Sequence, residues 1–236
     1  MIKITNPFKK LTKFEWILWI VSVIVITVSF LVPREKDIYS LVASVIGVTA
    51  LIFVAKGMVL GQILCVVFAV FYGIVAWSQR YYGEMLTYLG MSAPMAISAT
   101  ITWLKNPYGD TAEVTVRKTK PKEWLILCIL AVIVTISFFF LLRALGTANL
   151  PVSTISVATS FFAASLVFLR SPYYALAYAS NDLVLVVLWL FATISQISCL
   201  PMMLCFVMFL CNDLYAFFNW RKMEKRQKSE SPNGVN

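Results

Sequence analysis

Long apolar stretches follow one another along almost the whole chain, and they limit its possible folds more than any other feature. A helix needs about 20 mostly apolar residues to cross the hydrocarbon core of a bilayer. Eight stretches of suitable length stand at 16–32, 38–55, 59–78, 85–104, 124–145, 152–169, 173–194 and 199–218. Their connections are mostly short and leave no room for a soluble domain. The sequence therefore predicts an all-α integral membrane protein with eight transmembrane helices.

Composition supports lipid as the main solvent of the chain. Of its 236 residues, 60% are hydrophobic and 13% are charged, whereas a soluble domain is nearer to half apolar and about a quarter charged. A soluble enzyme and a secreted scaffold are therefore excluded. Histidine is absent, which removes the commonest general base and a standard ligand of zinc and haem iron. We expect neither a metal site nor a cofactor.

The cysteines are odd in number, never form a C-x-x-C pair and lie within or beside apolar runs. This pattern is typical of buried thiols that pack as small hydrophobic side chains, not of redox or metal-binding cysteines. The five residues are Cys65, Cys128, Cys199, Cys205 and Cys211.

Basic residues fall unequally on the two sides of the predicted membrane. With eight spans and a cytoplasmic N-terminus, 16 of the 20 Lys and Arg residues lie on the cytoplasmic side and 4 on the other. Because cytoplasmic loops carry an excess of Lys and Arg, we predict a multi-pass protein of the cell membrane with both termini in the cytoplasm. The same bias explains the net charge of +9 without nucleic acid as a partner.

The chain divides into two halves with matching landmarks. We predict a cytoplasmic N-terminus at 1–14, a first repeat at 15–105, a cytoplasmic linker at 106–122, a second repeat at 123–220 and a disordered cytoplasmic tail at 221–236. The matching landmarks are Glu15-Trp16 and Glu123-Trp124, Lys56 and Arg170, Trp77 and Trp189, Pro94-Met95 and Pro201-Met202, and Trp103 and Trp220. Each half has an even number of spans, so the two copies enter the membrane in the same direction. Parallel repeats of this kind are a standard way to build a transporter around a cavity at the membrane midplane.

Polar side chains inside a span are costly and usually face a cavity or a partner. In the seventh span Tyr178, Asp182 and Trp189 share one stripe at helical spacing, and Asn181 lies beside it. We interpret this face as one wall of a cavity. The alternative interpretation is structural, because Asn and Asp side chains also join helices by hydrogen bonds.

Two further spans carry candidates for the same cavity. Asn212 and Tyr215 share a face of the eighth span, and Tyr72 and Trp77 on the third span could supply a facing aromatic wall. A pocket of aromatic faces, amides and at most two carboxylates suits a flat, polar ring that is neutral or cationic. No Lys or Arg lies in the middle of a predicted span, so a phosphorylated substrate is disfavoured. We interpret Trp103, Trp220 and Tyr108 differently, as an aromatic belt at the membrane interface.

At this point the residues resemble a known family. The most specific stretches are the Arg170-Ser-Pro-Tyr-Tyr turn, Asn181-Asp182 followed by Trp189, and Asn212-Asp213-Leu-Tyr215 followed by Trp220. They resemble the nicotinamide riboside transporter family, PnuC, and the likeness covers residues 15–222.

The resemblance implies a 3+1+3 arrangement of two three-helix bundles, like that of the sugar-transporting SWEET proteins, with an additional N-terminal span. It also implies facilitated diffusion of a vitamin nucleoside that cytoplasmic phosphorylation then traps. Carried over by motif, Asn181, Trp189, Asn212 and Tyr215 are substrate-binding candidates. With the residues chosen above, the full candidate set is Asn181, Asp182, Trp189, Asn212, Tyr215, Tyr178, Tyr72 and Trp77.

Other functions remain open at this point. The same fold could carry another vitamin, such as thiamine or riboflavin. A membrane enzyme is disfavoured because no His exists to activate Ser153, Ser156 or Ser160, and a scaffold would not need paired polar positions on two helices. Expected partners are the small-molecule substrate and membrane lipid, and a homo-oligomer is left open.

The sequence also bears on the mode of transport. With no His, no mid-span Glu, and only Asp182 and Asp213 as acids within the predicted spans, the chain lacks an obvious ion site or proton relay. We therefore predict a uniport with no coupled sodium or proton.

Overall fold

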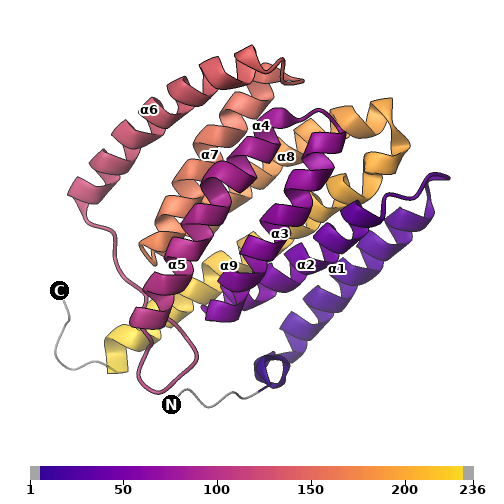
Figure 1. The fold of residues 1–236 in the computed structure, drawn as a ribbon. Helices are drawn as coiled ribbons and strands as arrows, with labels where there is room; N and C mark the ends of the chain where they lie inside the picture. Colours follow the sequence, from indigo (N-terminus) through magenta and orange to yellow (C-terminus); the bar gives the residue numbers. More distant parts are fainter. Residues whose placement is uncertain (1–5, 231–236) are drawn as a thin grey trace.

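The protein is described by a computed structural model that covers residues 6–230, and its regular elements are all helical (Figure 1). They are η1 (Pro7–Lys10), α1 (Lys13–Leu31), α2 (Ile38–Ala55), α3 (Val59–Ser78), α4 (Tyr82–Leu86), η2 (Thr87–Ser92), α5 (Ala93–Lys105), α6 (Pro121–Ala144), α7 (Leu150–Phe168), α8 (Tyr174–Ser195), η3 (Ile197–Cys199) and α9 (Leu200–Glu230). Seven of the described helices are long and apolar enough to cross a membrane. They correspond to seven of the eight predicted spans.

The remaining predicted span, at 85–104, is present as α4, η2 and α5 in one unbroken helical run from 82 to 105. This run is about 36 Å long at the rise of an α-helix, enough for a hydrocarbon core of about 30 Å. Its middle segment, η2, is a π-helix that ends directly before the first turn of α5, where Pro94 lies. A proline inside a regular α-helix clashes with the preceding turn, and a π-helical segment relieves that clash by widening the turn.

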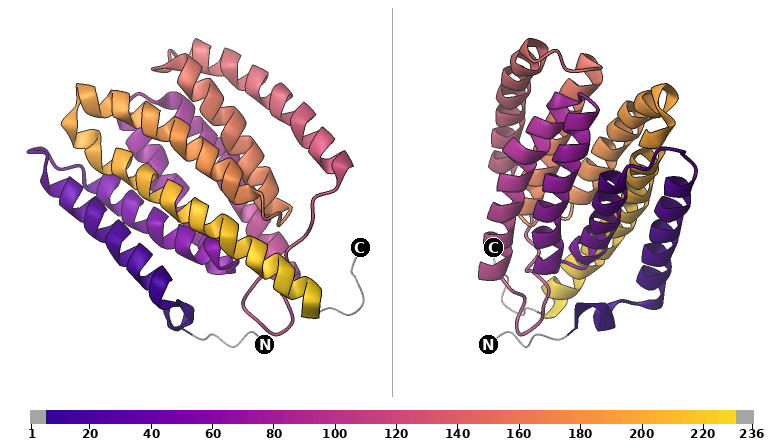
Figure 2. Two further views of the ribbon diagram at one scale, coloured as in Figure 1. Left: turned by 180° about the vertical axis from the view of Figure 1, so that it is seen from behind. Right: turned by 45° about the vertical axis from the view of Figure 1, so that its right-hand side comes forward.

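Six of the spans form a closed ring around the centre of the molecule. Each of α2, α3, α5, α7, α8 and α9 packs against the next, and α9 packs back against α2. Helix α1 lies outside the ring on α2 and α9, and α6 lies outside it on α7. Figure 2 shows α1 and α6 on opposite flanks of the bundle. This is the predicted 3+1+3 arrangement of two parallel repeats, with α6 as the connector and α1 as the additional helix.

The two repeats begin in the same way. The Glu15 carboxylate accepts a hydrogen bond of 2.6 Å from the backbone N–H of Thr12 and so caps α1. The Glu123 carboxylate accepts one of 2.7 Å from the backbone N–H of Lys120 and caps α6. An acidic residue in the first helical turn also complements the helix dipole. The repeated Glu-Trp landmark therefore marks two equivalent helix starts.

Helices α2 and α7 also end in the same way. Gly57 and Arg170 both adopt the left-handed conformation, with φ of 66° and 59°. Their backbone N–H groups donate to the carbonyls of Val54 at 2.8 Å and Val167 at 2.9 Å, as in a common helix C-terminal cap. The equivalent of Arg170 is therefore Gly57, one residue after the predicted Lys56.

Reciprocal hydrogen bonds tie the two repeats together at this end. The Trp103 indole N–H, from the first repeat, donates to the Val167 carbonyl at 3.2 Å. The Trp220 indole N–H, from the second repeat, donates to the Val54 carbonyl at 3.0 Å. Both indoles are almost completely buried inside the bundle. The predicted interfacial belt is therefore wrong for Trp103 and Trp220, because their N–H groups pair with protein carbonyls instead of facing lipid headgroups.

The end of α9 holds the linker between the repeats. The Gln227 amide accepts a hydrogen bond from the Val116 N–H at 2.8 Å and donates to the Val114 carbonyl at 3.1 Å. Tyr108 donates to the Glu230 carboxylate at 2.6 Å. The predicted disorder of 221–236 is therefore wrong for 221–230, which are helical and anchored by these contacts. Residues 231–236, and 1–5 of the predicted N-terminal segment, lie outside the described residues.

The cysteines divide into two groups. Cys199 and Cys205 are buried and Cys65 is half-buried, but Cys128 and Cys211 are exposed on the surface of the bundle. The prediction of buried thiols is wrong for the last two. A membrane helix can turn an apolar side chain outward without cost, because lipid is as apolar as the protein core.

Candidate functional site

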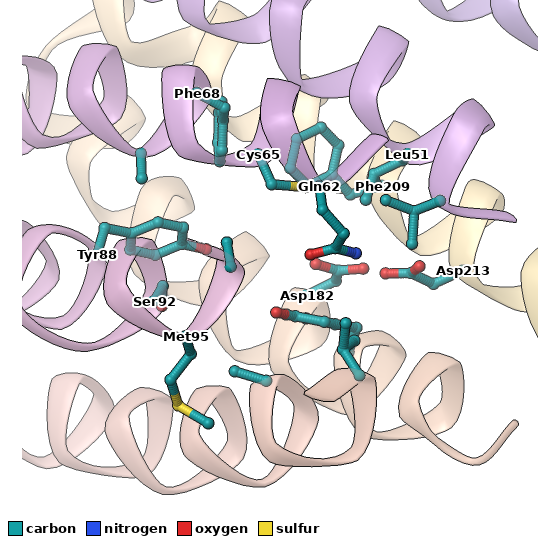
Figure 3. Close-up of a pocket in the computed structure, with 16 residues that line it drawn as sticks. Leu51, Gln62, Cys65, Phe68, Tyr88, Ser92, Met95, Asp182, Phe209 and Asp213 are labelled. Atoms are coloured by element: carbon teal, nitrogen blue, oxygen red, sulfur yellow. The ribbon is translucent and has the colours of Figure 1, made fainter. Parts of the chain in front are cut away.

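The six-helix ring encloses a narrow cavity with about 60 Å³ of free space. Its walls come from α2, α3, the η2–α5 segment, α7, α8 and α9, and they are mostly apolar. Polar groups enter the cavity from four of these elements (Figure 3). They belong to Gln62, Tyr88, Ser92, Tyr178, Asp182 and Asp213. Sites for drug-sized ligands have about 300–1,000 Å³, so the free space in this cavity is small by comparison.

Two carboxyl groups face each other in this cavity. Asp182 on α8 and Asp213 on α9 are each 2% exposed, and their side chains lie within hydrogen-bonding reach of each other. Figure 3 shows the Gln62 amide, from α3, pointing at the pair. No Lys or Arg is among the residues that line the cavity. The polar centre of the cavity is therefore acidic, and no basic side chain neutralises it there.

Aromatic rings border the acidic centre. Tyr178 is on the same face of α8 as Asp182, and Tyr88 projects from the π-helical segment. Phe68 packs edge-on against Tyr88, with ring centroids 5.8 Å apart, and lies tilted against Phe209 at 5.3 Å. This combination of aromatic walls and carboxylates can hold a flat, positively charged ring.

The structure brings two of the predicted site residues, Tyr178 and Asp182, to the cavity. Asn181 is not among the lining residues. Its side-chain carbonyl accepts hydrogen bonds from the hydroxyls of Thr159 at 2.8 Å and Ser160 at 2.9 Å. Asn181 therefore joins α8 to α7, which is the structural interpretation of this residue.

Trp189 and Tyr72 lie beyond one end of the cavity in a fully buried aromatic layer. The Trp189 indole N–H donates to the Tyr72 hydroxyl at 2.9 Å, and that hydroxyl donates to Glu84 at 3.4 Å. Tyr72 also packs against Tyr88, with ring centroids 4.2 Å apart. These two predicted site residues therefore close the cavity instead of lining it.

Glu84 corrects the sequence interpretation of the buried acids. The helical run of the fourth span begins at Tyr82, three residues before the predicted boundary, so Glu84 lies inside it. The residue is 0% exposed, and its Oε1 atom has no hydrogen-bond partner among the described residues. Asp182 and Asp213 are therefore not the only carboxyl groups within the spans.

The last three predicted site residues also lie outside the lining. Asn212 is buried beside Asp213, and its amide N–H donates to the Met208 carbonyl at 2.8 Å. The Tyr215 hydroxyl donates to Glu15 at 2.7 Å and holds α1 on α9. Trp77 is 59% exposed on the outer surface of α3. The predictions that Tyr215 and Trp77 face the cavity are wrong.

A second aromatic layer closes the opposite end of the cavity. Trp103 and Trp220 lie with ring centroids 5.5 Å apart, and Tyr174 packs edge-on against Trp220 at 4.8 Å. The carbonyl of Val54, which accepts from Trp220, belongs to a residue that lines the cavity. The candidate site is therefore confined between two layers of aromatic side chains.

Several residues of this cavity escaped the sequence analysis. Gln62 lies near the end of a predicted span, where its position fits a loop contact as well as a contact with substrate. Asp213 belongs to an Asn-Asp pair that is predicted to face the cavity, but the candidate set names only Asn212 from that pair. Tyr88 and Cys65 had no signal of their own, because one Tyr or Cys in an apolar span does not reveal which way it faces.

Comparison with known proteins gives a consistent result. Residues 37–222 match the sequence profile of a family described as "Nicotinamide mononucleotide transporter". The chain is 27% identical over 224 residues to a protein of Neisseria mucosa named "Nicotinamide riboside transporter PnuC", covering 93% of this chain and 85% of that one. It is 23% identical over 212 residues to a protein of the same name from Haemophilus influenzae, covering 89% and 91%.

A solved structure is similar over nearly its whole length. The structure titled "Crystal structure of the Vitamin B3 transporter PnuC" superposes with a TM-score of 0.80 at 26% identity, covering 92% of this chain and 94% of that chain.

Proposed function

The chain belongs to the nicotinamide mononucleotide transporter family, and on that premise we propose that this multi-pass membrane protein carries nicotinamide riboside across the cell membrane. Family membership confirms the resemblance found in the sequence and makes the protein a transporter of a small molecule. The choice of the riboside rests on one observation: the cavity is acidic and aromatic, and no Lys or Arg from the described part of the chain lines it.

The chemistry of the substrate matches this cavity. Nicotinamide riboside has a flat pyridinium ring with one positive charge, an amide, and ribose hydroxyls. Carboxylates and aromatic faces attract such a ring, and the Gln62 amide can both donate and accept hydrogen bonds. A mononucleotide adds a phosphate, which would lie close to Asp182 and Asp213 with no basic side chain to neutralise it. The riboside is therefore favoured over the mononucleotide that the family description names.

We propose that the substrate moves down its own gradient without a coupled ion. A membrane potential that is negative inside favours entry of a cation by about 2.3 kcal/mol per 100 mV. Phosphorylation in the cytoplasm would then trap the product, because the cavity disfavours phosphate. The measurement is counterflow in sealed vesicles at zero potential with equal pH on both sides. Exchange that appears only under a sodium or proton gradient would contradict the uniport.

Ligand binding to the purified protein tests the substrate directly. Calorimetry with nicotinamide riboside should give saturable binding, whereas nicotinamide mononucleotide at the same concentrations should give none. The same titration with thiamine and riboflavin covers the other vitamins. Tight binding of thiamine alone would show that the substrate is another cationic vitamin. Tight binding of riboflavin alone would contradict the proposal that Asp182 and Asp213 attract a cationic ring.

We propose further that both termini face the cytoplasm, as the distribution of Lys and Arg predicts. The start of α1, the linker and the end of α9 lie at one end of the bundle (Figure 1). Single cysteines placed in the 106–122 linker and near the C-terminus should both resist an impermeant thiol reagent added to intact cells. Labelling of the linker cysteine from outside would reverse the proposed orientation.

A further inference from the structure

We propose that Asp182 and Asp213 hold one proton between them, so that the cavity presents a single negative charge and selects ligands with a single positive charge. This inference rests on the proposed function, because it explains how the site recognises a cationic vitamin. It adds a specificity-determining residue, Asp213, and it makes the two carboxyl groups act as one unit.

The geometry places the two acids in an unusual environment. They come from adjacent helices, are 2% exposed, and lie within hydrogen-bonding reach of each other. No Lys or Arg of residues 6–230 lines the cavity, and the half-buried Lys56 is already paired with Glu15 at 3.0 Å. The titratable groups that face the pair are all neutral when protonated. They are Cys65 on α3, Tyr88 on η2, Tyr174 and Tyr178 on α8, and Cys205 on α9, and Cys211 lies near the pair but on the exposed surface of α9.

Only one protonation state of the pair fits both this environment and a cationic ligand. Two ionised carboxylates in contact, with no counter-charge, repel each other strongly in a dry cavity. Two protonated groups do not repel, but they offer no charge to a cation. One proton shared between them makes a strong charged hydrogen bond and leaves one net negative charge.

One unpaired atom and one amide that points into the cavity indicate that a ligand belongs at this position. The Asp182 Oδ2 atom is buried and has no hydrogen-bond partner within residues 6–230. The Gln62 side chain is 3% exposed and points into the cavity at the acid pair (Figure 3). Buried polar groups are normally satisfied, so a ligand that brings a positive charge and hydrogen-bonding groups would complete both contacts.

The charge of the loaded site follows from this arrangement. A monocation neutralises the pair, whereas a neutral ligand of the same shape leaves one buried charge without a partner. The proton remains on the pair when the ligand binds and leaves, so no proton is carried across the membrane. The proposal is therefore compatible with a uniport.

The test compares two ligands that differ almost only in charge. Nicotinamide riboside is a cation, and its reduced dihydropyridine form is neutral with nearly the same shape. Binding of both is measured by calorimetry on the full-length protein in lipid nanodiscs. The wild type should prefer the cation by about tenfold or more, since losing one member of a buried charge pair is costly.

Variants assign the preference to the pair. Asp182→Asn and Asp213→Asn each leave one carboxylate and should keep most of the preference. The double variant has no charge and should bind the two ligands with similar affinity. Glu84→Gln removes a buried carboxyl group that does not line the cavity and should keep the wild-type preference. A double variant that still prefers the cation would overturn the proposal.

A second measurement needs no variant to fold. Infrared spectroscopy of the wild type with bound cation should contain a protonated-carboxyl band from the pair. Asp213→Asn should remove this band if that variant folds, whereas Glu84→Gln, which removes another buried carboxyl group, should leave it. Absence of the band in the wild type means that both groups are ionised, and this would also overturn the proposal. The proposed function can fail separately from the proposal about the pair. If thiamine binds and the riboside does not, the proposed substrate is wrong. The infrared band and the effect of the double variant on thiamine binding would still test whether the two carboxyl groups share a proton.

Discussion

At the scale of single residues, Gln62 shows how little the sequence reveals about direction. Its position near the start of α3 suggests a loop contact, yet its side chain is buried and points at Asp182 and Asp213 (Figure 3). Gly61 and Gln62, in the first turns of α3, are both buried inside the bundle, and Gln62 reaches the cavity from there.

Replacing Gln62 by leucine should weaken binding of nicotinamide riboside by about 1–3 kcal/mol, because the ligand group that pairs with the amide would be left unsatisfied. Gln196→Leu is the matched control, since Gln196 is exposed at the end of α8 and outside the main cavity. Calorimetric titration of both variants measures the effect. Equal losses in the two variants would indicate a general loss of stability and not a contact with the ligand.

Some residues predicted to face the cavity do so and others do not, and the difference has a physical reason. Tyr178 and Asp182 reach the cavity because an acid inside a span has few acceptable positions, and helical spacing then places Tyr178 on the same face. Trp77 is equally aromatic and lies on the lipid side. Lipid and protein core are both apolar, so an aromatic residue in a span does not reveal whether it faces inward or outward.

At the scale of elements, the junction of α2 and α3 depends on a close approach of two backbones. A Cβ atom at Gly61 would lie 2.4 Å from the backbone nitrogen of Val54. No side-chain movement can relieve a contact with backbone. The short connection after Gly57 therefore works only with a glycine at 61, which lets α3 pack directly on the end of α2.

Gly61→Val should accordingly destabilise the protein by at least the roughly 1–3 kcal/mol that is typical of overpacking. It should also lower the melting temperature in detergent. Gly90→Ala is the control, because a Cβ atom at Gly90 meets nothing within 4 Å. A thermal shift assay on both variants compares them. If the two melting temperatures are the same, the close approach is not needed for stability.

The boundaries of elements were harder to predict than their existence. All eight spans follow from apolar length, which the bilayer fixes. The π-helical segment and the three extra residues at the start of the fourth span do not, because both depend on packing against α3 and α7. For this reason the span predicted at 85–104 leaves Glu84 outside the membrane. The helical end of α9 was missed for a similar reason: its polar residues bind the linker, and composition alone does not reveal such a partner.

At the scale of the whole molecule, two aromatic layers border the cavity, and the bonds of Trp103 and Trp220 run between the repeats. Opening this end of the cavity therefore has to break contacts that join the two bundles. Each indole hydrogen bond contributes about 0.5–1.5 kcal/mol, so the pair can hold this end mostly closed while the motion remains accessible. The repeats were predictable from landmarks and the 3+1+3 arrangement from the family resemblance, whereas this closure depends on contacts across the interface.

The double variant Trp103→Phe, Trp220→Phe should open this end more often. Cys65 lines the cavity and reports on access to it, in a background where the other four cysteines are replaced by alanine. Modification of Cys65 by a small thiol reagent should become about tenfold faster, the factor expected from losing two such bonds. Trp77→Phe on the outer surface should leave the rate unchanged. An unchanged rate in the double variant would show that the indole bonds do not control access.

The reciprocal indole bonds also indicate how the two-repeat chain could have arisen. Each repeat contains both a donor and an acceptor, Trp103 with Val54 in the first and Trp220 with Val167 in the second. A contact in which one surface supplies both partners is self-complementary, as at the two-fold axis of a symmetric dimer. A half-length chain with this surface would therefore pair with an identical copy through the same two bonds. The present interface has the form expected of such an ancestral homodimer after its two genes were fused.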